Sequence, residues 1–189
     1  LIPDKNYFMA AQNGYLCLDY ASTNKEIVEN MPYATYIDIY DTLSIKNYYY
    51  TDQHWKQETL MPTVRELLAG MGKETSAEYN IVTVEKDFYG TYYGPSTFDK
   101  TSPDVIQYLT NETIENCKVT SYDTGTGKKT SIYTLEDLEG NDMYDVYLGG
   151  PDALIVIENP NATTEDELVI FRDSFGSSLT PLLAEGYAK

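Results

Sequence analysis

Three side chains in this sequence have types and spacing that suit acyl transfer: Ser174, His54 and Asp52. His54 is the only histidine among 189 residues, and Asp52 stands two positions before it. In extended backbone, residues two positions apart point to the same side, so the carboxylate can accept a ring proton and orient the imidazole. The other ring nitrogen is then free to take the proton of the Ser174 hydroxyl. Alternatively, the Asp-x-His pair does no more than satisfy a loop.

Ser174 stands at a predicted junction between a buried strand and a helix. Residues 168–171 are consecutive apolar side chains, typical of a central parallel strand, and apolar residues then recur at helical spacing from Phe175 to Leu183. At such a junction the hydroxyl projects from a tight turn, and the N–H groups of Ser174 and Phe175 are natural donors to an oxyanion. The alternative is that Ser174 only caps the helix.

Other residues could complete an oxyanion site. A second donor could come from Gly149 and Gly150 or from the loop 90–93, although both glycine clusters could serve only as turns. Arg172 could crowd the turn before Ser174, or place a positive charge near an oxyanion or a sugar carboxylate.

Aromatic residues next to these motifs could bind a sugar. Trp55, Tyr92 and Tyr93 could stack on a sugar ring, or they could be core and rim aromatics. The whole sequence has 19 tyrosines, a number that fits carbohydrate platforms and also fits simple strand propensity.

The pattern of elements predicts one α/β domain over residues 1–189, trimmed at both ends. Helices are expected at 20–30 and 59–70, and strands at 34–39, 78–88 and 153–157. The glycines around 124–128 predict a β-hairpin, inserted at the edge of the α/β core.

Composition excludes several functions. The formal net charge of −17 repels phosphate backbones, so nucleic acid is not an expected partner. No apolar run reaches the ~20 residues of a membrane span. A single histidine and two cysteines 100 positions apart match no metal site, and we expect no metal and no cofactor. Cys17 and Cys117 could form one disulfide or remain two separate thiols.

The motifs also resemble a known family. Tyr-Thr-Asp-Gln-His-Trp at 50–55, the loop 90–93 and Val-Ile-Phe-Arg-Asp-Ser-Phe at 169–175 are similar to the DHHW family of bacterial proteins, and so is the opening at 2–7. That family belongs to the SGNH-hydrolase-like group, with the alginate O-acetylation proteins. Two departures are Gln53, in place of the first histidine of the motif, and Arg172, in place of the glycine of Gly-Asp-Ser.

The resemblance implies an SGNH-like three-layer α/β/α fold with a mostly parallel central sheet. It assigns Ser174 as nucleophile, His54 as base and Asp52 as the partner of His54. It also implies a secreted or cell-surface bacterial protein that moves acetyl groups on or off an extracellular carbohydrate, by acyl transfer or ester hydrolysis, with possible cell-envelope partners. The alternative is a non-catalytic glycan-binding or assembly module that keeps the fold.

Overall fold

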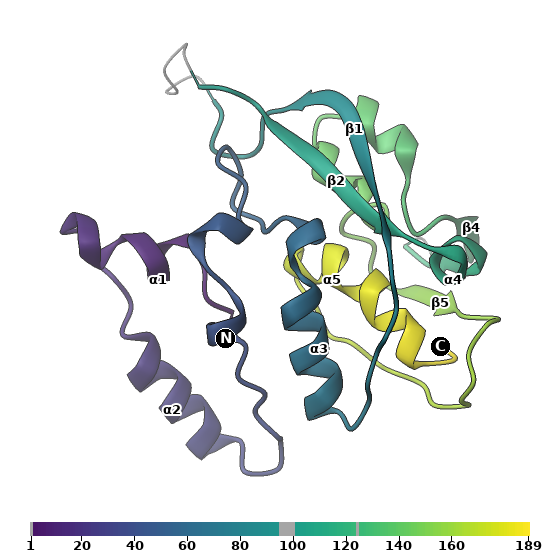
Figure 1. Ribbon diagram of the computed structural model, residues 1–189, viewed down its shortest axis with the longest axis horizontal. Coiled ribbons are helices and arrows are strands. Elements are labelled where there is room, and N and C mark those ends of the chain that lie inside the picture. Colours follow the sequence, from purple (N-terminus) through teal and green to yellow (C-terminus); the bar gives the residue numbers. More distant parts are fainter. Residues whose placement is uncertain (1, 95–100, 124) are drawn as a thin grey trace.

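The computed structural model describes residues 2–94, 101–123 and 125–189 (Figure 1). Leu1 lies outside the described residues, and so does Thr124, which belongs to the predicted hairpin turn. The helices and strands, in chain order, are α1 (Lys5–Met9), α2 (Tyr20–Asn30), α3 (Met61–Gly70), β1 (Asn80–Phe88), β2 (Asp104–Thr110), α4 (Glu112–Asn116), β3 (Lys118–Ser121), β4 (Lys128–Thr130), β5 (Ile155–Glu158) and α5 (Phe175–Leu183). Short 3₁₀ turns connect many of them. The chain is therefore a mixed α/β protein.

Two small antiparallel sheets replace the parallel sheet that the sequence suggested. The strands β1 and β2 form a two-stranded ribbon, and β4, β3 and β5 form a three-stranded sheet in that order. No parallel strand pair occurs among the described residues, so the prediction of a mostly parallel central sheet is wrong for this part of the chain. The predicted hairpin exists as β3 and β4.

The segment 168–171 explains this difference. It belongs to no strand and no sheet, and the side chains of Val169 and Phe171 are 77% and 99% exposed. A run of apolar residues indicates that its side chains could be buried. A central strand also needs hydrogen-bonded neighbours along both of its edges. The described residues do not supply those neighbours.

Helix predictions agree better with the structure, because helix signals are local. The helix expected at 20–30 is α2, capped by the Asp19 carboxylate on the N–H of Ser22. The helix expected at 59–70 is α3, with Pro62 in its first turn, where a missing N–H costs nothing. The strand expected at 34–39 is irregular chain instead.

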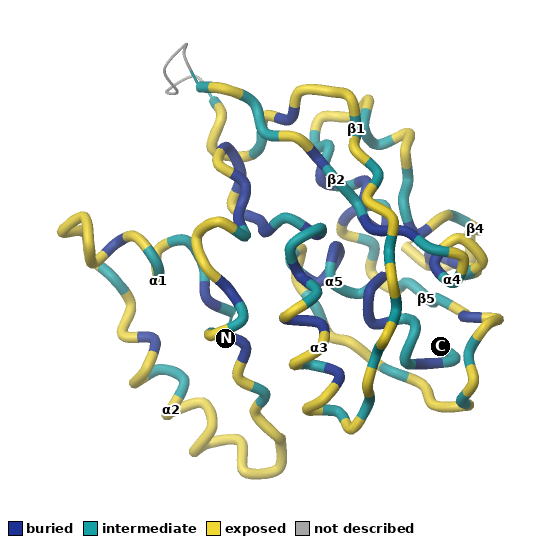
Figure 2. The backbone as a smooth tube through the Cα atoms, in the orientation of Figure 1, coloured by how far each residue is buried: buried dark blue, intermediate teal, exposed yellow. Residues whose placement is uncertain are grey.

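The main hydrophobic core lies between α3 and α5, which run side by side (Figure 1). Trp55, Leu60, Val64, Leu68 and Leu182 in this core are fully buried. By contrast, α2 is exposed along most of its length (Figure 2). The start of α5, which follows Ser174, is therefore fixed by the best-packed part of the molecule.

A second core cluster consists largely of aromatic rings. Its buried members are Tyr49, Phe88, Ile106, Tyr144, Val146 and Tyr147. It joins the chain before His54 to the β1–β2 ribbon and to the 3₁₀ turn Met143–Val146. The first cluster therefore packs against the helix that follows Ser174, and the second contains residues just before His54.

Among the described residues, no helix combines the length and the apolar character that crossing a bilayer requires. Within the same ranges, no three His, Cys, Asp or Glu side chains gather as they would around a metal ion. Cys17 and Cys117 are both free thiols, so no disulfide joins them.

Candidate active site

The structure places Ser174, His54 and Asp52 in one hydrogen-bonded row. The Ser174 Oγ lies 2.7 Å from His54 Nε2, and His54 Nδ1 lies 2.5 Å from Asp52 Oδ1. With the Asp52 carboxylate ionised, Nδ1 donates to it and Nε2 accepts from the serine hydroxyl. The imidazole is therefore held in the tautomer that can receive the Ser174 proton.

Asp52 and His54 meet through a turn and not through a regular strand. Tyr48 and Trp55 form an isolated antiparallel bridge, and the chain between them reverses. The Asp52 Oδ1 also accepts the backbone N–H of His54 at 2.8 Å, which is the local bond of an Asx turn. The i, i+2 spacing thus brings the two side chains together by a different local geometry from the extended backbone we expected.

The Ser174 hydroxyl does not cap α5. Its side chain makes no capping bond, whereas the Asp173 Oδ1 accepts the N–H of Phe175 at 3.0 Å. Asp173 therefore performs the capping role that the sequence left open for Ser174, and the hydroxyl is directed to His54. As a further consequence, the Phe175 N–H is engaged, while the Ser174 N–H has no hydrogen-bond partner among the described residues.

Asp52 is fully buried and has partners on both oxygens. Its Oδ2 accepts the backbone N–H of Thr91 at 2.8 Å. Burial alone would raise the pKa of Asp52, but the hydrogen bonds from His54 and from the Thr91 N–H outweigh it and lower the pKa to about 2. The carboxylate is therefore ionised throughout the physiological pH range.

Gly90 allows this close approach. A Cβ at Gly90 would lie 2.1 Å from the Cβ of Asp52, so no other residue fits without a shift of the loop. The loop 90–93 was a candidate source of an oxyanion donor, but its N–H groups are engaged with Thr51, Asp52 and Gly90. In this structure the loop supports the carboxylate.

Tyr144 is a site residue that sequence reasoning missed. Its ring is stacked on the His54 imidazole at 3.8 Å between centroids and 7° between planes. Its hydroxyl lies 2.7 Å from Ser178 Oγ, which also accepts the indole N–H of Trp55 at 2.8 Å. Because Tyr144 is one of 19 tyrosines and lies 90 residues from His54, no local pattern marked it.

Trp55 belongs to the core and not to a sugar platform. Its side chain is fully buried, so it cannot stack on a substrate ring, and that candidate role is wrong. Tyr92 and Tyr93 are 51% and 43% exposed on the loop whose Thr91 holds Asp52. The ammonium of Lys5 lies 4.6 Å from the centre of the Tyr92 ring.

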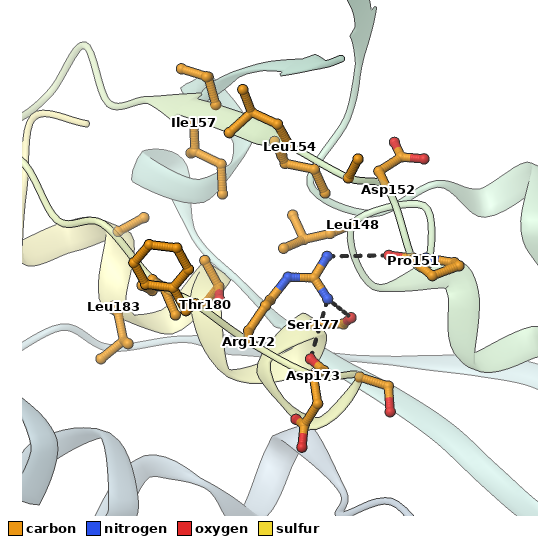
Figure 3. A pocket seen from close by; sticks show the side chains of 18 of the residues that line it. Leu148, Pro151, Asp152, Leu154, Ile157, Arg172, Asp173, Ser177, Thr180 and Leu183 are labelled. Carbon is orange, nitrogen blue, oxygen red and sulfur yellow. Dashed lines mark hydrogen bonds between the residues drawn. The ribbon is translucent and has the colours of Figure 1, made fainter. Parts of the chain in front are cut away.

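Arg172 connects the start of α5 to the Gly149–Gly150 turn (Figure 3). Its guanidinium donates to Ser177 Oγ at 2.6 Å and to the Gly150 carbonyl at 3.2 Å. Burial lowers its pKa from the usual value, and the nearby carboxylates of Asp152 and Asp173 oppose that shift. The charge is thus engaged within the protein, and it stabilises the turn before Ser174.

The Gly149–Gly150 turn offers no donor to Ser174 in this structure. The Gly150 N–H lies 3.5 Å from the Tyr147 carbonyl, and its own carbonyl accepts Arg172. Gly150 lines the cavity beside Ser174, but Gly149 does not. Both residues have positive φ, which explains why glycine occupies them.

A cavity of about 800 Å³ extends from His54 and Ser174 along β5 and the segment before α5 (Figure 3). Leu154 and Ile157 lie on one side of it, and Thr180 and Leu183 of α5 lie on the other. Five carboxylates line it, those of Asp142, Asp145, Asp152, Glu167 and Asp173, and so does the side chain of Lys189.

The buried Asp52 carboxylate predicts an acid-sensitive stability. Its pKa is about 2 in the folded chain and ~3.9 when unfolded, so its contribution is present above pH ~4 and is lost as the pH falls to ~2. Between pH ~5 and ~2 the unfolding free energy should fall by about 2 kcal/mol more in the wild type than in Asp52→Asn. Urea unfolding at several pH values measures this difference, and equal pH dependence in both proteins would contradict it.

No family model matches this chain, and no curated protein matches it either. Solved structures do match. A DHHW family protein from Eubacterium siraeum DSM 15702 is 21% identical, with a TM-score of 0.68, over 94% of this chain and 64% of that one. PatB1 from Bacillus cereus is 22% identical, with a TM-score of 0.61, over 75% of this chain and 52% of that one. PatB1 with a sulfonyl adduct is 19% identical, with a TM-score of 0.64, over 100% of this chain and 68% of that one.

These neighbours define the class of fold. The chain shares the fold of a DHHW family protein and of PatB1, which supports the resemblance seen in the motifs at the level of structure. It spans 64% and 52% of the length of the first two of those chains. The wider SGNH-hydrolase relation stays a prediction.

Proposed function

We propose that this chain carries a serine-dependent acyl-transfer site, with Ser174 as nucleophile, His54 as general base and Asp52 as the residue that orients His54. The observation that carries the proposal is the row of two short hydrogen bonds, 2.7 Å from Ser174 to His54 and 2.5 Å from His54 to Asp52. Nucleophile, base and orienting acid in that order are the parts that acyl transfer through a serine requires.

The reaction would proceed in two halves. As the Ser174 Oγ attacks the acyl carbonyl carbon, its proton passes to His54 Nε2 and the carbonyl oxygen becomes an oxyanion. The Ser174 N–H, which has no hydrogen-bond partner among the described residues, is the donor we propose for that oxyanion. The bond to the leaving alkoxide then breaks, and His54 returns the proton to that oxygen, which leaves an acyl ester on Ser174. A sugar hydroxyl or a water then attacks the ester by the same steps in reverse.

The charges around the site favour an uncharged substrate. Four aspartates and Glu167 line the cavity. Of the two cations in the lining, Lys189 lies 3.8 Å from Glu167, and the Arg172 guanidinium is engaged with Ser177 and Gly150. The combined negative potential of the carboxylates opposes an anionic acyl donor or a sugar carboxylate. We therefore favour a neutral acetyl ester as donor and a neutral carbohydrate as acceptor, at a secreted or cell-surface location in keeping with the family resemblance.

Two reagents test the nucleophile. p-Nitrophenyl acetate should add one acetyl group to Ser174, and a sulfonyl fluoride should form a sulfonate ester there with loss of fluoride. The second reagent is chosen because one structural neighbour carries a sulfonyl adduct. Peptide mass mapping should locate both groups on Ser174, and Ser174→Ala should take up neither. Ser131→Ala, at an exposed serine, is the matched control, and equal labelling of Ser174→Ala and wild type would reject the proposal.

Tyr144 should influence turnover through the position of His54. Tyr144→Leu removes the ring stacked on the imidazole, and we expect kcat for p-nitrophenyl acetate to fall about 10- to 100-fold with little change in KM. Tyr144→Phe keeps the ring and loses only the hydroxyl bond to Ser178, so its kcat should stay within about threefold of wild type. An equal fall of kcat in both variants would show that turnover depends on the Tyr144 hydroxyl and not on the stacked ring.

A second candidate function is glycan binding without catalysis. It is favoured by the exposure of Tyr92 and Tyr93 on the loop beside Asp52, since exposed tyrosine rings can stack on sugars. Calorimetry with an acetylated xylo-oligosaccharide separates the two functions. Binding that survives Ser174→Ala, is lost in Tyr92→Ala and is accompanied by no turnover in the wild type would favour the binding module.

A further inference from the structure

We propose that Asp104, the first residue of β2, is a positioning residue for the triad. Its carboxylate holds the backbone of residues 50–51 and so keeps Asp52 beside His54. The inference rests on the proposed function and deepens it, because it names a second carboxylate on which the orientation of His54 depends. Asp104 acts through Asp52 and not on the reacting atoms, so it is not a catalytic residue.

Three hydrogen bonds join the Asp104 carboxylate to two consecutive residues. Its Oδ1 accepts the backbone N–H of Tyr50 at 2.9 Å. Its Oδ2 accepts the backbone N–H of Thr51 at 2.6 Å and the Thr51 hydroxyl at 2.7 Å. The donors lie 54 and 53 positions from Asp104 in the sequence, so no local turn explains these bonds. Hydrogen bonds to a charged acceptor are short and about twice as strong as neutral ones.

Thr51 transmits this hold to Asp52, because it stands directly before it in the chain. Its side chain is buried, and its hydroxyl also accepts the N–H of Gly90 at 3.2 Å. The next residue of that loop, Thr91, donates its N–H to Asp52 Oδ2 at 2.8 Å. The Thr51 hydroxyl therefore connects the Asp104 carboxylate with the loop that holds the Asp52 carboxylate.

The β1–β2 ribbon gives Asp104 a fixed base. Asp104 is paired with Phe88, the last residue of β1, and Phe88 is fully buried in the aromatic core cluster. The loop 90–93 follows β1 almost directly. Both strands therefore contact the turn that carries Asp52: β2 through the Asp104 side chain, and β1 through the loop that follows it.

His54 has supports that do not pass through Asp104. The Tyr144 ring is stacked on its imidazole, and the neighbouring Trp55 donates its indole N–H to a serine hydroxyl of α5 at 2.8 Å. Removal of the Asp104 carboxylate should therefore displace Asp52 from His54 and leave the imidazole near α5. The bond that should be lost is the 2.5 Å contact between His54 Nδ1 and Asp52 Oδ1.

The alternative is that Asp104 only stabilises the end of the ribbon, since backbone N–H groups need acceptors wherever they occur. Its loss would then lower the free energy of unfolding and leave every folded molecule fully active. The place of the donors favours the positioning role, because all three belong to residues 50–51, next to Asp52.

Nitrogen NMR of His54 tests the proposal without turnover. The chain has one histidine, so its ring nitrogen shifts, detected through the ring C–H protons, are assigned without ambiguity. At a pH where the ring is neutral, the wild type should show one tautomer, with the proton on Nδ1. In Asp104→Ala the shifts should move toward those of a free imidazole, because Asp52 no longer fixes that proton.

Kinetics with p-nitrophenyl acetate give a second measure. Asp104→Ala should lower kcat about 10- to 100-fold and leave KM within about threefold, because a displacement of ~1 Å has effects of that size. Thr51→Val keeps the volume of the side chain and removes only its hydroxyl, and kcat should fall about tenfold. Thr51→Ser restores the hydroxyl and should keep kcat within about threefold of the wild type.

Asn111→Ala is the matched control at the opposite end of β2. The Asn111 Oδ1 accepts the N–H of Ile114 and caps α4, so its removal also takes a side-chain acceptor from backbone N–H groups. This variant should lose stability, but it should keep the ring shifts of His54 and keep kcat within about twofold of the wild type.

Two results would overturn the proposal. One is a folded Asp104→Ala with wild-type ring shifts and wild-type kcat, and the other is an equal change of both in Asn111→Ala. If Asp104→Ala does not fold, Thr51→Val and Thr51→Ser decide, and equal kcat in those two variants would overturn it. A wild type without a proton on His54 Nδ1 would contradict the triad itself, so failure of the proposed function is distinguishable from failure of this inference.

Discussion

Asp52→Asn should lower kcat for acyl transfer by about 10⁴-fold while the protein stays folded. An asparagine can still accept one N–H through its amide oxygen, but it has no charge to stabilise the imidazolium. Its amide NH₂ can also donate to His54 Nδ1, which places the ring proton on Nε2 and prevents that atom from accepting the Ser174 proton. The loss of a triad carboxylate by this change has an effect of about 10⁴ in serine proteases. Steady-state kinetics with p-nitrophenyl acetate measure the fall.

Asp87→Asn is the control for this change. Asp87 is an exposed carboxylate on β1, and its removal should leave kcat unchanged. The two variants lose the same formal charge, so the comparison separates a local role of Asp52 from the effect of net charge. If Asp52→Asn kept more than about a tenth of wild-type kcat, His54 would not depend on Asp52 and the triad would lose its third member.

The chemical residues of the site were predictable because their signals are short-range. A lone histidine with a carboxylate two positions before it, and a serine before an amphipathic helix, can be read directly from the sequence. The two residues are 120 positions apart in the sequence, and only the tertiary structure brings the Ser174 Oγ within 2.7 Å of His54 Nε2. The residue types, together with the resemblance to the DHHW family, led to the prediction that the two segments meet, although the spacing in the sequence does not fix that meeting.

The supporting residues were harder to predict. The Tyr144 ring is stacked on His54, and this contact leaves no trace in the sequence around either residue. Trp55 looked like a platform because it follows His54, but its indole fills the core between α3 and α5 and donates to Ser178. An amphipathic aromatic ring next to a motif can contact the substrate or belong to the hydrophobic core, and only the packing of the folded chain determines which.

The sheet was mispredicted for a related reason. The apolar run 168–171 was predicted to be a buried central strand, but it forms no strand in this structure, because burial and pairing depend on neighbours that sequence patterns do not specify. The exposed side chains of Val169 and Phe171 are thus the point at which the sequence pattern and the described structure disagree most.

Gly90→Ala should impair both stability and activity, because its new Cβ would lie 2.1 Å from the Cβ of Asp52. The loop would have to move away, and the 2.8 Å bond from the Thr91 N–H to Asp52 would be lost. A buried carboxylate without one of its donors costs ~1–3 kcal/mol, and the steric displacement adds to that. We expect the unfolding free energy to fall by about 3 kcal/mol and kcat to fall about 10²-fold, because His54 is misplaced with its partner.

Gly94→Ala separates this effect from a general loss of loop flexibility. A Cβ at Gly94 meets no described atom within 4 Å, so that variant should stay within about 0.5 kcal/mol of the wild type in urea unfolding. In Gly90→Ala, loss of the Thr91 bond should also raise the pKa of Asp52 toward its usual value, so less stability is lost between pH ~5 and ~2 than in the wild type. Wild-type turnover in Gly90→Ala would show that the contact between the loop and Asp52 is dispensable, and that Asp52 does not need the Thr91 donor to orient His54.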